Sequence, residues 1–305
     1  MTFPQRLDRI AGLMEQRLRA IIGQKVECGR LNGAVSGRLV AAVRHAALGG
    51  GKRFRPFLVA ESAGVFGIPV EAVLDAAAAL ECVHCYSLVH DDLPAMDNDE
   101  LRRGQPTVWK AFDEWTAILA GDALLTLAFE VLAGSETHRD AQVRVDLISG
   151  LARAAGAAGM VGGQAFDLEA EKLGKPAALE VSHIRRLQSM KTGALIEYAC
   201  EAGAILGQAP VEERLALRRY GEALGRAFQI ADDLLDAEGD AVTVGKRVAK
   251  DAAAGKATLV SLIGIGAARA ELAAVEQDAV EALAPFGARA NVLIEAARFM
   301  AKRKS

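Results

Sequence analysis

Aromatic residues are scarce in this chain: they make up 5% of its 305 residues, although hydrophobic residues as a whole reach 51%. Strands favour aromatic and β-branched side chains, whereas alanine, which recurs throughout this sequence, favours helices. The composition therefore argues against a sheet protein and predicts a packed helical one. A chain of this length can form one large domain or two ordinary ones.

Charge of one sign is not in excess, because 36 Lys and Arg face 39 Asp and Glu, for a net charge of -3. Nothing in this balance indicates nucleic acid or an anionic membrane as a partner. The first ten residues, MTFPQRLDRI, lack the apolar stretch of a signal peptide, and no uncharged, strongly apolar run of 18 residues occurs. We therefore expect a cytoplasmic protein without a membrane span.

Several familiar catalytic motifs are absent: there is no G-x-S-x-G, no HExxH, no Rossmann fingerprint and no P-loop pattern. Cysteine is also scarce. The four cysteines are Cys28, Cys82, Cys85 and Cys200. Cys82 and Cys85 form one CxxC, but a zinc or redox site of this kind needs further ligands, so two small core residues are the favoured interpretation.

Helical periodicity recurs along the whole chain. Apolar residues follow three- and four-residue steps in stretches such as 71–90, 114–134 and 214–236, and Gly- and Pro-marked breaks separate them. This pattern predicts roughly ten to twelve helices of ordinary length. No break is long or polar enough for an interdomain linker, and no fixed-period repeat occurs. We expect residues 1–305 to form a single all-α domain.

The first informative motif is ADDLLD at residues 231–236. On a helix, Asp232 and Asp236 lie one turn apart on the same face, with Asp233 on the flank. Two carboxylates at about 6 Å repel by about 3 kcal/mol at an effective dielectric near 20. The apolar neighbours predict partial burial, which makes the repulsion costlier. A magnesium ion, which prefers oxygen ligands, would resolve it.

A second acidic motif, HDDLPAMD, occupies residues 90–97. Asp91 and Asp97 are six residues apart and would lie on different faces of a straight helix. Pro94 breaks the helix and disfavours helical geometry at Leu93, so the backbone can bring Asp97 back towards Asp91. Either motif alone could be a solvated acidic helix end. Two such motifs favour a site in which several magnesium ions and a diphosphate lie between facing carboxylates.

Basic residues that could bind such a diphosphate stand in Gly-containing turns. GGGKRFRP (residues 49–56) carries Lys52, Arg53 and Arg55, and LRRGQPT (residues 101–107) carries a pair of arginines. Each of these is individually more typical of a solvated surface cation. Their combination with the acidic motifs, and the lack of a protein nucleophile, indicates ionisation of a diphosphate ester. Metal ions would stabilise the leaving group, and apolar walls would keep water from a carbocation.

Together these motifs resemble the trans-isoprenyl diphosphate synthases, most closely the short-chain, farnesyl-forming enzymes of bacteria. The matching pieces are GGKRFRP, HCYSLVHDDLPAMDNDELRRGQPT, AILAGDALLTLAF, GGQAFDL, MKTGAL, FQIADDLLD, and GKR followed by GKAT, over residues 49–258. The resemblance implies mostly antiparallel helices around a central cavity, usually in a homodimer. It also implies head-to-tail condensation of isopentenyl diphosphate with an allylic diphosphate.

The resemblance assigns roles residue by residue. As magnesium ligands it implies Asp91, Asp97 and Asp232, supported by Asp92, Asp233 and Asp236. As isopentenyl diphosphate ligands it implies Lys52, Arg55, His84 and Arg103. As ligands of the allylic diphosphate it implies Arg102, Lys191, Thr192, Gln229, Lys246 and Lys256. Gln164 and Asp167 match the GGQxxD element. The catalytic set is then Asp91, Asp92, Asp97, Arg102, Lys191, Asp232 and Lys246.

The resemblance also implies that Tyr86, with Ser87 beside it, determines the length of the product. Tyr86 precedes Asp91 by five residues, about 7.5 Å along a straight helix. In the family, an aromatic residue at this position and the two-residue insertion in DDLPAMD are typical of farnesyl-forming enzymes. Taken alone, Tyr86 could instead be a core residue without a role in product length. Asn98, Trp109 and Trp115 depart from the family pattern without touching an expected ligand.

Three alternatives stay open at this point. A geranylgeranyl diphosphate synthase shares the ligands but generally has a small residue in place of Tyr86. A terpene cyclase would usually lack GGKRFRP and the second DDxxD. A non-catalytic helical subunit that modulates a partner would not need intact acidic and basic motifs, so their presence argues against this alternative.

Overall fold

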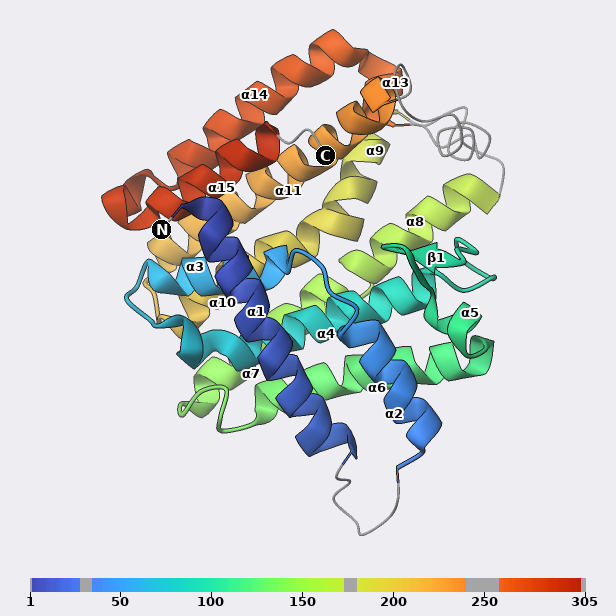
Figure 1. Cartoon of the computed structure of the whole chain (residues 1–305). Helices are drawn as coiled ribbons and strands as arrows, with labels where there is room; N and C mark the ends of the chain where they lie inside the picture. The colour runs from blue at the N-terminus through green and yellow to red at the C-terminus, as the bar shows by residue number, and fades with distance from the viewer. Residues whose placement is uncertain (1, 28–34, 173–179, 240–257, 303–305) are drawn as a thin grey trace. The chain divides into compact units, whose positions relative to one another are not determined.

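The computed structural model describes residues 2–27, 35–172, 180–239 and 258–302. Nearly all of them are helical (Figure 1). The only strands in these ranges are β1 (Leu101–Arg102) and β2 (Gln105–Pro106), a two-residue antiparallel pair in which Leu101 faces Pro106 and Arg102 faces Gln105. The prediction of an all-α chain with ten or more helices is therefore confirmed.

The chain divides into two compact units. Unit 1 comprises residues 1–149 and 205–208, and unit 2 comprises residues 150–204 and 209–305. The prediction of one domain around a central cavity concerns how the two units meet, and it stays a prediction.

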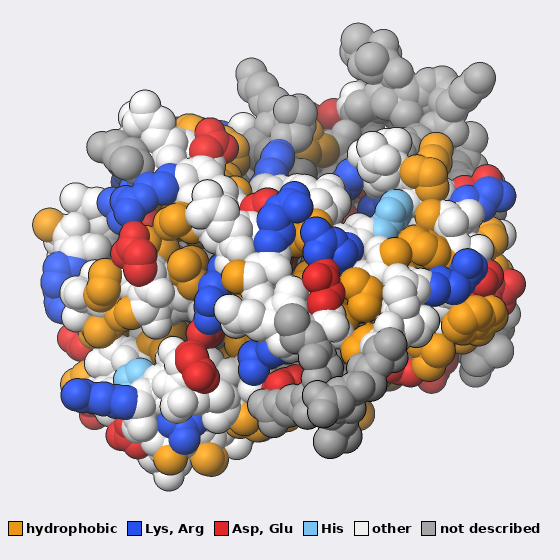
Figure 2. All heavy atoms as spheres, turned by 60° about the horizontal axis from the view of Figure 1, so that its bottom comes forward, with side chains coloured by type: hydrophobic (Ala, Val, Ile, Leu, Met, Phe, Trp, Pro, Cys, Tyr) orange, Lys and Arg blue, Asp and Glu red, His pale blue; other side chains and the backbone are white. Residues whose placement is uncertain are grey.

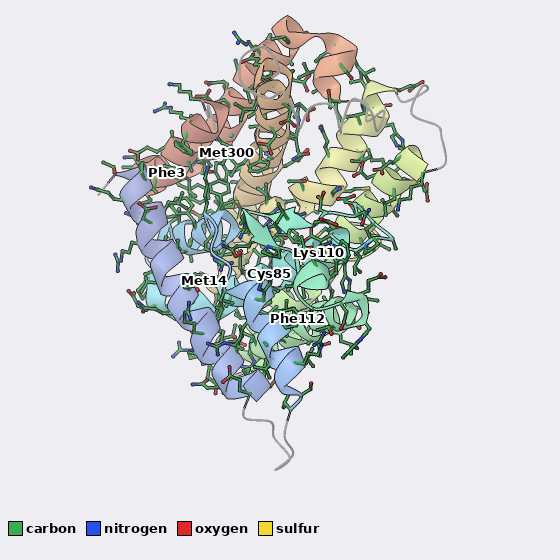
Figure 3. The ribbon with its side chains drawn as sticks, turned by 45° about the vertical axis from the view of Figure 1, so that its right-hand side comes forward. Phe3, Met14, Cys85, Lys110, Phe112 and Met300 are labelled. Carbon is green, nitrogen blue, oxygen red and sulfur yellow. The ribbon has the colours of Figure 1, made fainter. Side chains whose placement is uncertain are left out.

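Unit 1 contains most of the N-terminal helices. Its elements are α1 (Phe3–Ile21), η1 (Ile22–Glu27), α2 (Gly37–Ala47), α3 (Phe54–Gly64), η2 (Val70–Val73), α4 (Leu74–Asp91), α5 (Val108–Ala111), α6 (Glu114–Ala133) and the first part of α7 (Ala141–Ala155). The α1 helix buries a stripe at three- and four-residue steps that includes Phe3, Leu7 and Met14 (Figure 3). Its start is fixed by a capping box, in which Thr2 and Gln5 satisfy each other's backbone groups.

The α4 helix is the centre of unit 1. Four consecutive alanines (residues 76–79) are buried, so neighbouring helices approach it closely, and α6 runs beside it (Figure 1). Two forked ion pairs tie α1 to other parts of this unit: Arg6 to Glu61 at 2.9 and 2.8 Å, and Arg17 to Asp75 at 2.5 and 2.8 Å.

Unit 2 holds the remaining helices. They are α8 (Met160–Lys172), α9 (Val181–Gln188), η4 (Ser189–Gly193), α10 (Ala194–Leu206, except its last two residues), α11 (Val211–Gly239), α13 (Leu259–Ile263), α14 (Ile265–Ala282), η5 (Ala284–Ala290) and α15 (Asn291–Ala301). The α11 helix is its longest element, and α14 packs along it (Figure 1). The buried Tyr220 of α11 donates to the carbonyl of Leu293 at 2.8 Å and ties α11 to α15.

Two helical segments are long and apolar enough to cross a membrane by length and composition alone, Val70–Asp91 and Glu114–Ala133. Their apolar windows are 72% and 50% buried inside the protein. Core helices of globular proteins pass the same test, so the finding is weak support for a membrane span. Figure 2 shows one face of the molecule, on which acidic and basic side chains are interspersed among hydrophobic ones.

Candidate active site

In unit 1, the HDDLPAMD motif lies where α4 ends. Asp91 is the last residue of the helix, and the chain turns back within six residues, so that the amide of Asp97 donates to the carbonyl of Asp91 at 2.9 Å. Pro94 stands in this turn, as the sequence predicts. A second backbone bond, from Asp99 to the carbonyl of Asp92 at 3.1 Å, closes the loop again. The backbone therefore brings Asp97 next to Asp91 despite their spacing.

Asp92 is only 3% exposed, and Arg102 of β1 binds it. The Arg102 Nε and Nη2 atoms donate to Asp92 Oδ1 at 2.8 and 2.6 Å, and Nε also reaches Oδ2 at 3.1 Å. Burial raises the pKa of Asp92, and the hydrogen bonds from Arg102 counteract only part of that rise. This pair fixes the β1–β2 hairpin against the end of α4.

The hairpin turn carries Arg103, which has a left-handed backbone (φ 52°) beside Gly104 (φ 77°). Its guanidinium donates to the carbonyl of Gly50. Gly51 has φ 123°, a backbone conformation that L side chains rarely adopt, and an added Cβ would lie 2.7 Å from the Arg103 guanidinium carbon, so the guanidinium would have to shift. The two basic motifs of unit 1 are therefore in direct contact, although 53 residues separate Gly50 from Arg103.

Arg55 of α3 and His84 of α4 form a second basic pair. The Arg55 Nη1 atom lies 3.3 Å from His84 Nε2, and the Arg55 Nε atom is buried without a hydrogen-bond partner. Burial, followed by the positive charges of Arg55 and Arg103, holds the pKa of His84 well below its usual value. His84 is therefore neutral at neutral pH, and its Nε2 atom can accept from Arg55.

Arg53 differs from its basic neighbours, because its guanidinium is used inside unit 1. Its Nη atoms donate to Glu81 at 2.6 Å, to Glu15 at 3.1 Å and to the carbonyl of Ala47 at 2.6 Å, and the side chain is 2% exposed. Arg53 thus anchors the GGGKRFRP turn. Lys52, one residue before it, is exposed.

Asp97 and Asn98 show what the acidic loop requires. One carboxylate oxygen of Asp97, Oδ1, is buried without a hydrogen-bond partner. Asn98 has a left-handed backbone (φ 53°), which asparagine tolerates better than most residues, and its amide donates to the carbonyl of Leu93 at 3.1 Å. The loop geometry thus accounts for the asparagine that departs from the family pattern.

In unit 2, the ADDLLD motif lies near the C-terminal end of α11. Asp232 is half-buried and Asp236 is exposed, whereas Asp233 is turned towards α9 and α13. The Asp233 carboxylate accepts from Gln188 Nε2 and from the amide of Leu259, both at 3.0 Å. Burial raises its pKa, and these hydrogen bonds offset part of the rise. Asp233 therefore supports the fold locally, whereas Asp232 and Asp236 share the neighbouring face of the helix.

Lys191 lies in η4, a π-helical turn, and donates to Asp167 of α8 at 2.6 Å. The two elements approach closely because Gly163 has no side chain: an added Cβ would lie 2.6 Å from the Lys191 Cα atom and 2.8 Å from the Met190 carbonyl carbon. The glycines of GGQAFDL therefore allow α8 to pack directly against the MKTG turn. This turn also carries Thr192, beside Lys191.

Gln164, on the same glycine-rich turn of α8, is 8% exposed, and both atoms of its amide are buried without a hydrogen-bond partner. Across the described residues, the buried side-chain atoms without a partner belong to four residues: Arg55, Ser62, Asp97 and Gln164. Three of these four are residues that the sequence assigns to the site. Buried polar groups are normally satisfied, so such a concentration is informative.

Tyr86 is 6% exposed on α4, and Ser87 beside it is half-buried, with its hydroxyl donating to the carbonyl of His84 at 2.9 Å. Burial, and then the nearby charge of Asp91, raise the pKa of Tyr86. Gln229 is half-buried on α11, one turn before Asp233. Lys246 and Lys256 lie outside the described residues.

The polyprenyl synthetase family model matches residues 37–284. The chain belongs to this family. It is 43% identical over 288 residues to the farnesyl diphosphate synthase of Escherichia coli, covering 93% of this chain and 92% of the relative. The Geobacillus stearothermophilus farnesyl diphosphate synthase is 42% identical over 268 residues, 88% of either chain. A plant relative, geranylgeranyl pyrophosphate synthase 9 of Arabidopsis thaliana, is 40% identical over 266 residues, 86% of this chain and 73% of that one.

Among solved structures, an FPP/GFPP synthase from Zymomonas mobilis aligns with a TM-score of 0.86 at 43% identity, covering 98% of each chain. The predicted family resemblance is thereby confirmed, and so is the prediction of a trans-prenyltransferase. The bacterial farnesyl diphosphate synthases fit better than the geranylgeranyl alternative, since they match at higher identity over more of the chain.

Sequence reasoning missed some residues that shape the site. Gly51 and Gly163 allow close approaches that only the folded backbone reveals. His90 was not singled out, although its spacing of four residues from Tyr86 on one helix was a usable signal. Arg53, grouped by sequence with the basic donors, is a structural residue in the fold.

Proposed function

We propose that this prenyltransferase condenses isopentenyl diphosphate head-to-tail with dimethylallyl and then geranyl diphosphate, and that its product is farnesyl diphosphate. The allylic diphosphate ionises, the double bond of isopentenyl diphosphate attacks the cation, and one proton is then lost from the methylene carbon next to the new cationic centre. No protein nucleophile is required. The proton can pass to the released diphosphate, as the family resemblance implies.

The observation that carries this proposal is the set of buried polar atoms without partners. Asp97 offers a carboxylate oxygen, Arg55 a guanidinium N–H, and Gln164 a whole amide. An acceptor, a cationic donor and an amide suit a ligand that carries both anionic oxygens and bound cations. Leaving them unsatisfied costs about 1–3 kcal/mol each, which a bound ligand would recover.

Magnesium is the cation that these residues fit. Within the described residues no three Asp, Glu, His or Cys side chains are grouped to hold a metal ion by themselves. Magnesium usually takes only one or two protein carboxylates, together with water and substrate phosphates. We assign Asp91, Asp97 and Asp232 as its principal ligands and Asp236 as a supporting one. Bound there, magnesium would neutralise the charge of the departing diphosphate.

Asp92 and Asp233 support the metal ligands indirectly in this proposal. Asp92 holds Arg102 by a fork of hydrogen bonds, and Asp233 is held by Gln188 and Leu259. With two of its nitrogens on Asp92, Arg102 has its Nη1 side left for the allylic diphosphate, while Lys191, Thr192 and Gln229 bind the same group from unit 2. Lys246 and Lys256 complete this set by resemblance.

Isopentenyl diphosphate binds, in this proposal, to Lys52, Arg55, His84 and Arg103. Arg55 and His84 are in contact, and Arg103 touches the glycine turn that precedes them, so these donors converge within unit 1. A neutral His84 can donate one N–H to a phosphate oxygen without adding charge. Lys52 is exposed and contributes a mobile point charge.

Tyr86 and Ser87 set the farnesyl length in this proposal. A bulky ring on α4, one and a half turns before Asp91, would end the space available to the growing chain. Geranylgeranyl diphosphate is the alternative product, and a small residue at this position would favour it. A non-catalytic modulator is disfavoured, because it would have no need for unsatisfied polar atoms in both units.

We also propose a homodimer in the cytoplasm, without a membrane span. Three large apolar side chains of α6 are well exposed: Trp115 (57%), Ile118 (44%) and Leu119 (46%). They follow helical spacing on one face of the most apolar helix, with a mean hydropathy of 1.7. Such a face is typically covered, and a second copy of the chain is the partner that the family resemblance implies.

The test is a product assay. Purified protein with dimethylallyl and isopentenyl diphosphates and Mg²⁺ should give farnesyl diphosphate, and removal of Mg²⁺ with a chelator should stop the reaction. Asp91→Ala and Asp232→Ala should each lower turnover by orders of magnitude while circular dichroism and melting stay normal. Near-normal turnover of either variant would count against the metal assignment, and a main product of 20 carbons would support the geranylgeranyl alternative.

A further inference from the structure

Within unit 1, α6 packs along α4, and one residue of this interface is Gly121. This glycine is buried and lies directly beneath the ring of His90. A Cβ added at Gly121 would overlap His90 Nε2 and lie 2.9 Å from Cε1. Real side chains do not tolerate such distances, so any residue other than glycine must displace the imidazole.

The His90 ring is held on two more sides. Its Nε2 atom lies 3.1 Å from the carbonyl of Ile118, one turn earlier on α6, and 4.0 Å from a carboxylate oxygen of the exposed Asp122. The hydrogen bond to a carbonyl requires the tautomer with a proton on Nε2. The imidazole is thus seated in a notch made by Ile118, Gly121 and Asp122.

From this seat, His90 contacts Tyr86. The two rings are 5.7 Å apart between centroids and cross at 80°, an edge-to-face arrangement. Residues four apart on a helix meet in this way, and such aromatic pairs are worth about 0.5–1.5 kcal/mol beyond their buried area. The ring position of Tyr86 therefore depends on His90 of the same helix and on Gly121 of α6, against which His90 is seated.

We infer that His90, seated on Gly121, is a positioning residue that holds the Tyr86 ring and thereby sharpens product length. The inference rests on the proposed role of Tyr86 in ending chain growth. Gly121 then becomes a determinant of product length that lies on another helix, α6, and touches neither substrate nor metal. When His90 is displaced, Tyr86 gains rotamer freedom, and a fraction of molecules lets the farnesyl chain grow by one more unit.

The experiment measures the ratio of 20-carbon to 15-carbon product at saturating isopentenyl diphosphate. Gly121→Ala and His90→Ala should each raise the 20-carbon share, by up to about tenfold, because loss of a contact of this size shifts a rotamer equilibrium by that factor. His90→Ala removes the ring without adding bulk, so it provides a second route if Gly121→Ala melts too early. Gly12→Ala is the matched control, since nothing lies within 4 Å of its added Cβ, and it should keep the parent ratio.

The double variant Tyr86→Ala/Gly121→Ala separates the inference from the proposed function. If Gly121 acts through Tyr86, the double variant should have the same product ratio as Tyr86→Ala alone. A farnesyl-only product from both Gly121→Ala and His90→Ala, together with longer product from Tyr86→Ala, would overturn the inference and leave the proposed function intact. Unchanged product length in Tyr86→Ala would instead remove Tyr86, and the inference with it, from this role.

Discussion

At the scale of single residues, the site of unit 1 depends on ionisable groups buried beside each other. Asp92 is buried against Arg102, and His84 is enclosed near four arginines. Burial and the positive charges of four arginines, Arg55 and Arg103 first among them, disfavour the protonated imidazole, so folding keeps His84 neutral. Its neutral state is what allows the contact with Arg55 at 3.3 Å.

This burial predicts a pH dependence of stability. The pKa of His84 is lowered in the folded protein, so the unfolded chain binds the proton more tightly, and the stabilisation present above about pH 6.5 is lost as pH falls. Between pH 7.5 and 5.5 the wild type should lose more unfolding free energy than His84→Gln, by about 1 kcal/mol. Urea unfolding of both proteins at the two pH values measures this difference. Equal losses would contradict the assignment of a neutral, buried His84.

At the scale of elements, glycines decide which helices can meet. Gly163 packs against the Met190–Lys191 backbone. This contact places the Lys191 Nζ atom 2.6 Å from the Asp167 Oδ2 atom. Backbone atoms cannot move aside as flexible side chains can. The π-helical turn η4 and the glycine-rich start of α8 therefore form one interlocked support for Lys191 and Gln164.

Gly163→Ala should consequently lower stability by about 2 kcal/mol or more and lower prenyl transfer as well, because overpacking separates α8 from η4. Thermal melting and the product assay measure the two effects. The matched substitution Gly266→Ala, on α14 of the same unit, has nothing within 4 Å of its Cβ and should leave both unchanged or slightly improved. Equal behaviour of the two variants would contradict the interlocking.

Much of this was predictable from the sequence at the element scale. The helical periods, the break at Pro94 and the return of Asp97 to Asp91 follow from spacing and local backbone rules. The sequence could not predict that Arg53 turns inward to Glu81 or that Asp233 turns to Gln188, because those outcomes depend on contacts between distant segments. Both are polar residues whose partners lie 28 and 45 residues away.

At the scale of the whole molecule, the exposed face of α6 predicts assembly. Leu119→Glu places a charge beside Trp115 and Ile118 and should convert a dimer into a monomer, because a charge in an apolar interface core is costly. Light scattering coupled to gel filtration measures the mass. A wild type that is already monomeric, or a Leu119→Glu variant that stays dimeric, would contradict this interface.

In the proposed reaction, Asp91, Asp97 and Asp232 bind the same diphosphate through shared cations. Anomalous diffraction from crystals grown with Mn²⁺ and a non-ionising thio-analogue of the allylic diphosphate tests this most directly. We predict manganese peaks bonded to Asp91 and Asp97 of unit 1 and to Asp232 of unit 2, with the diphosphate oxygens between them. Metal bound by one acidic motif alone, with the diphosphate elsewhere, would contradict the central claim.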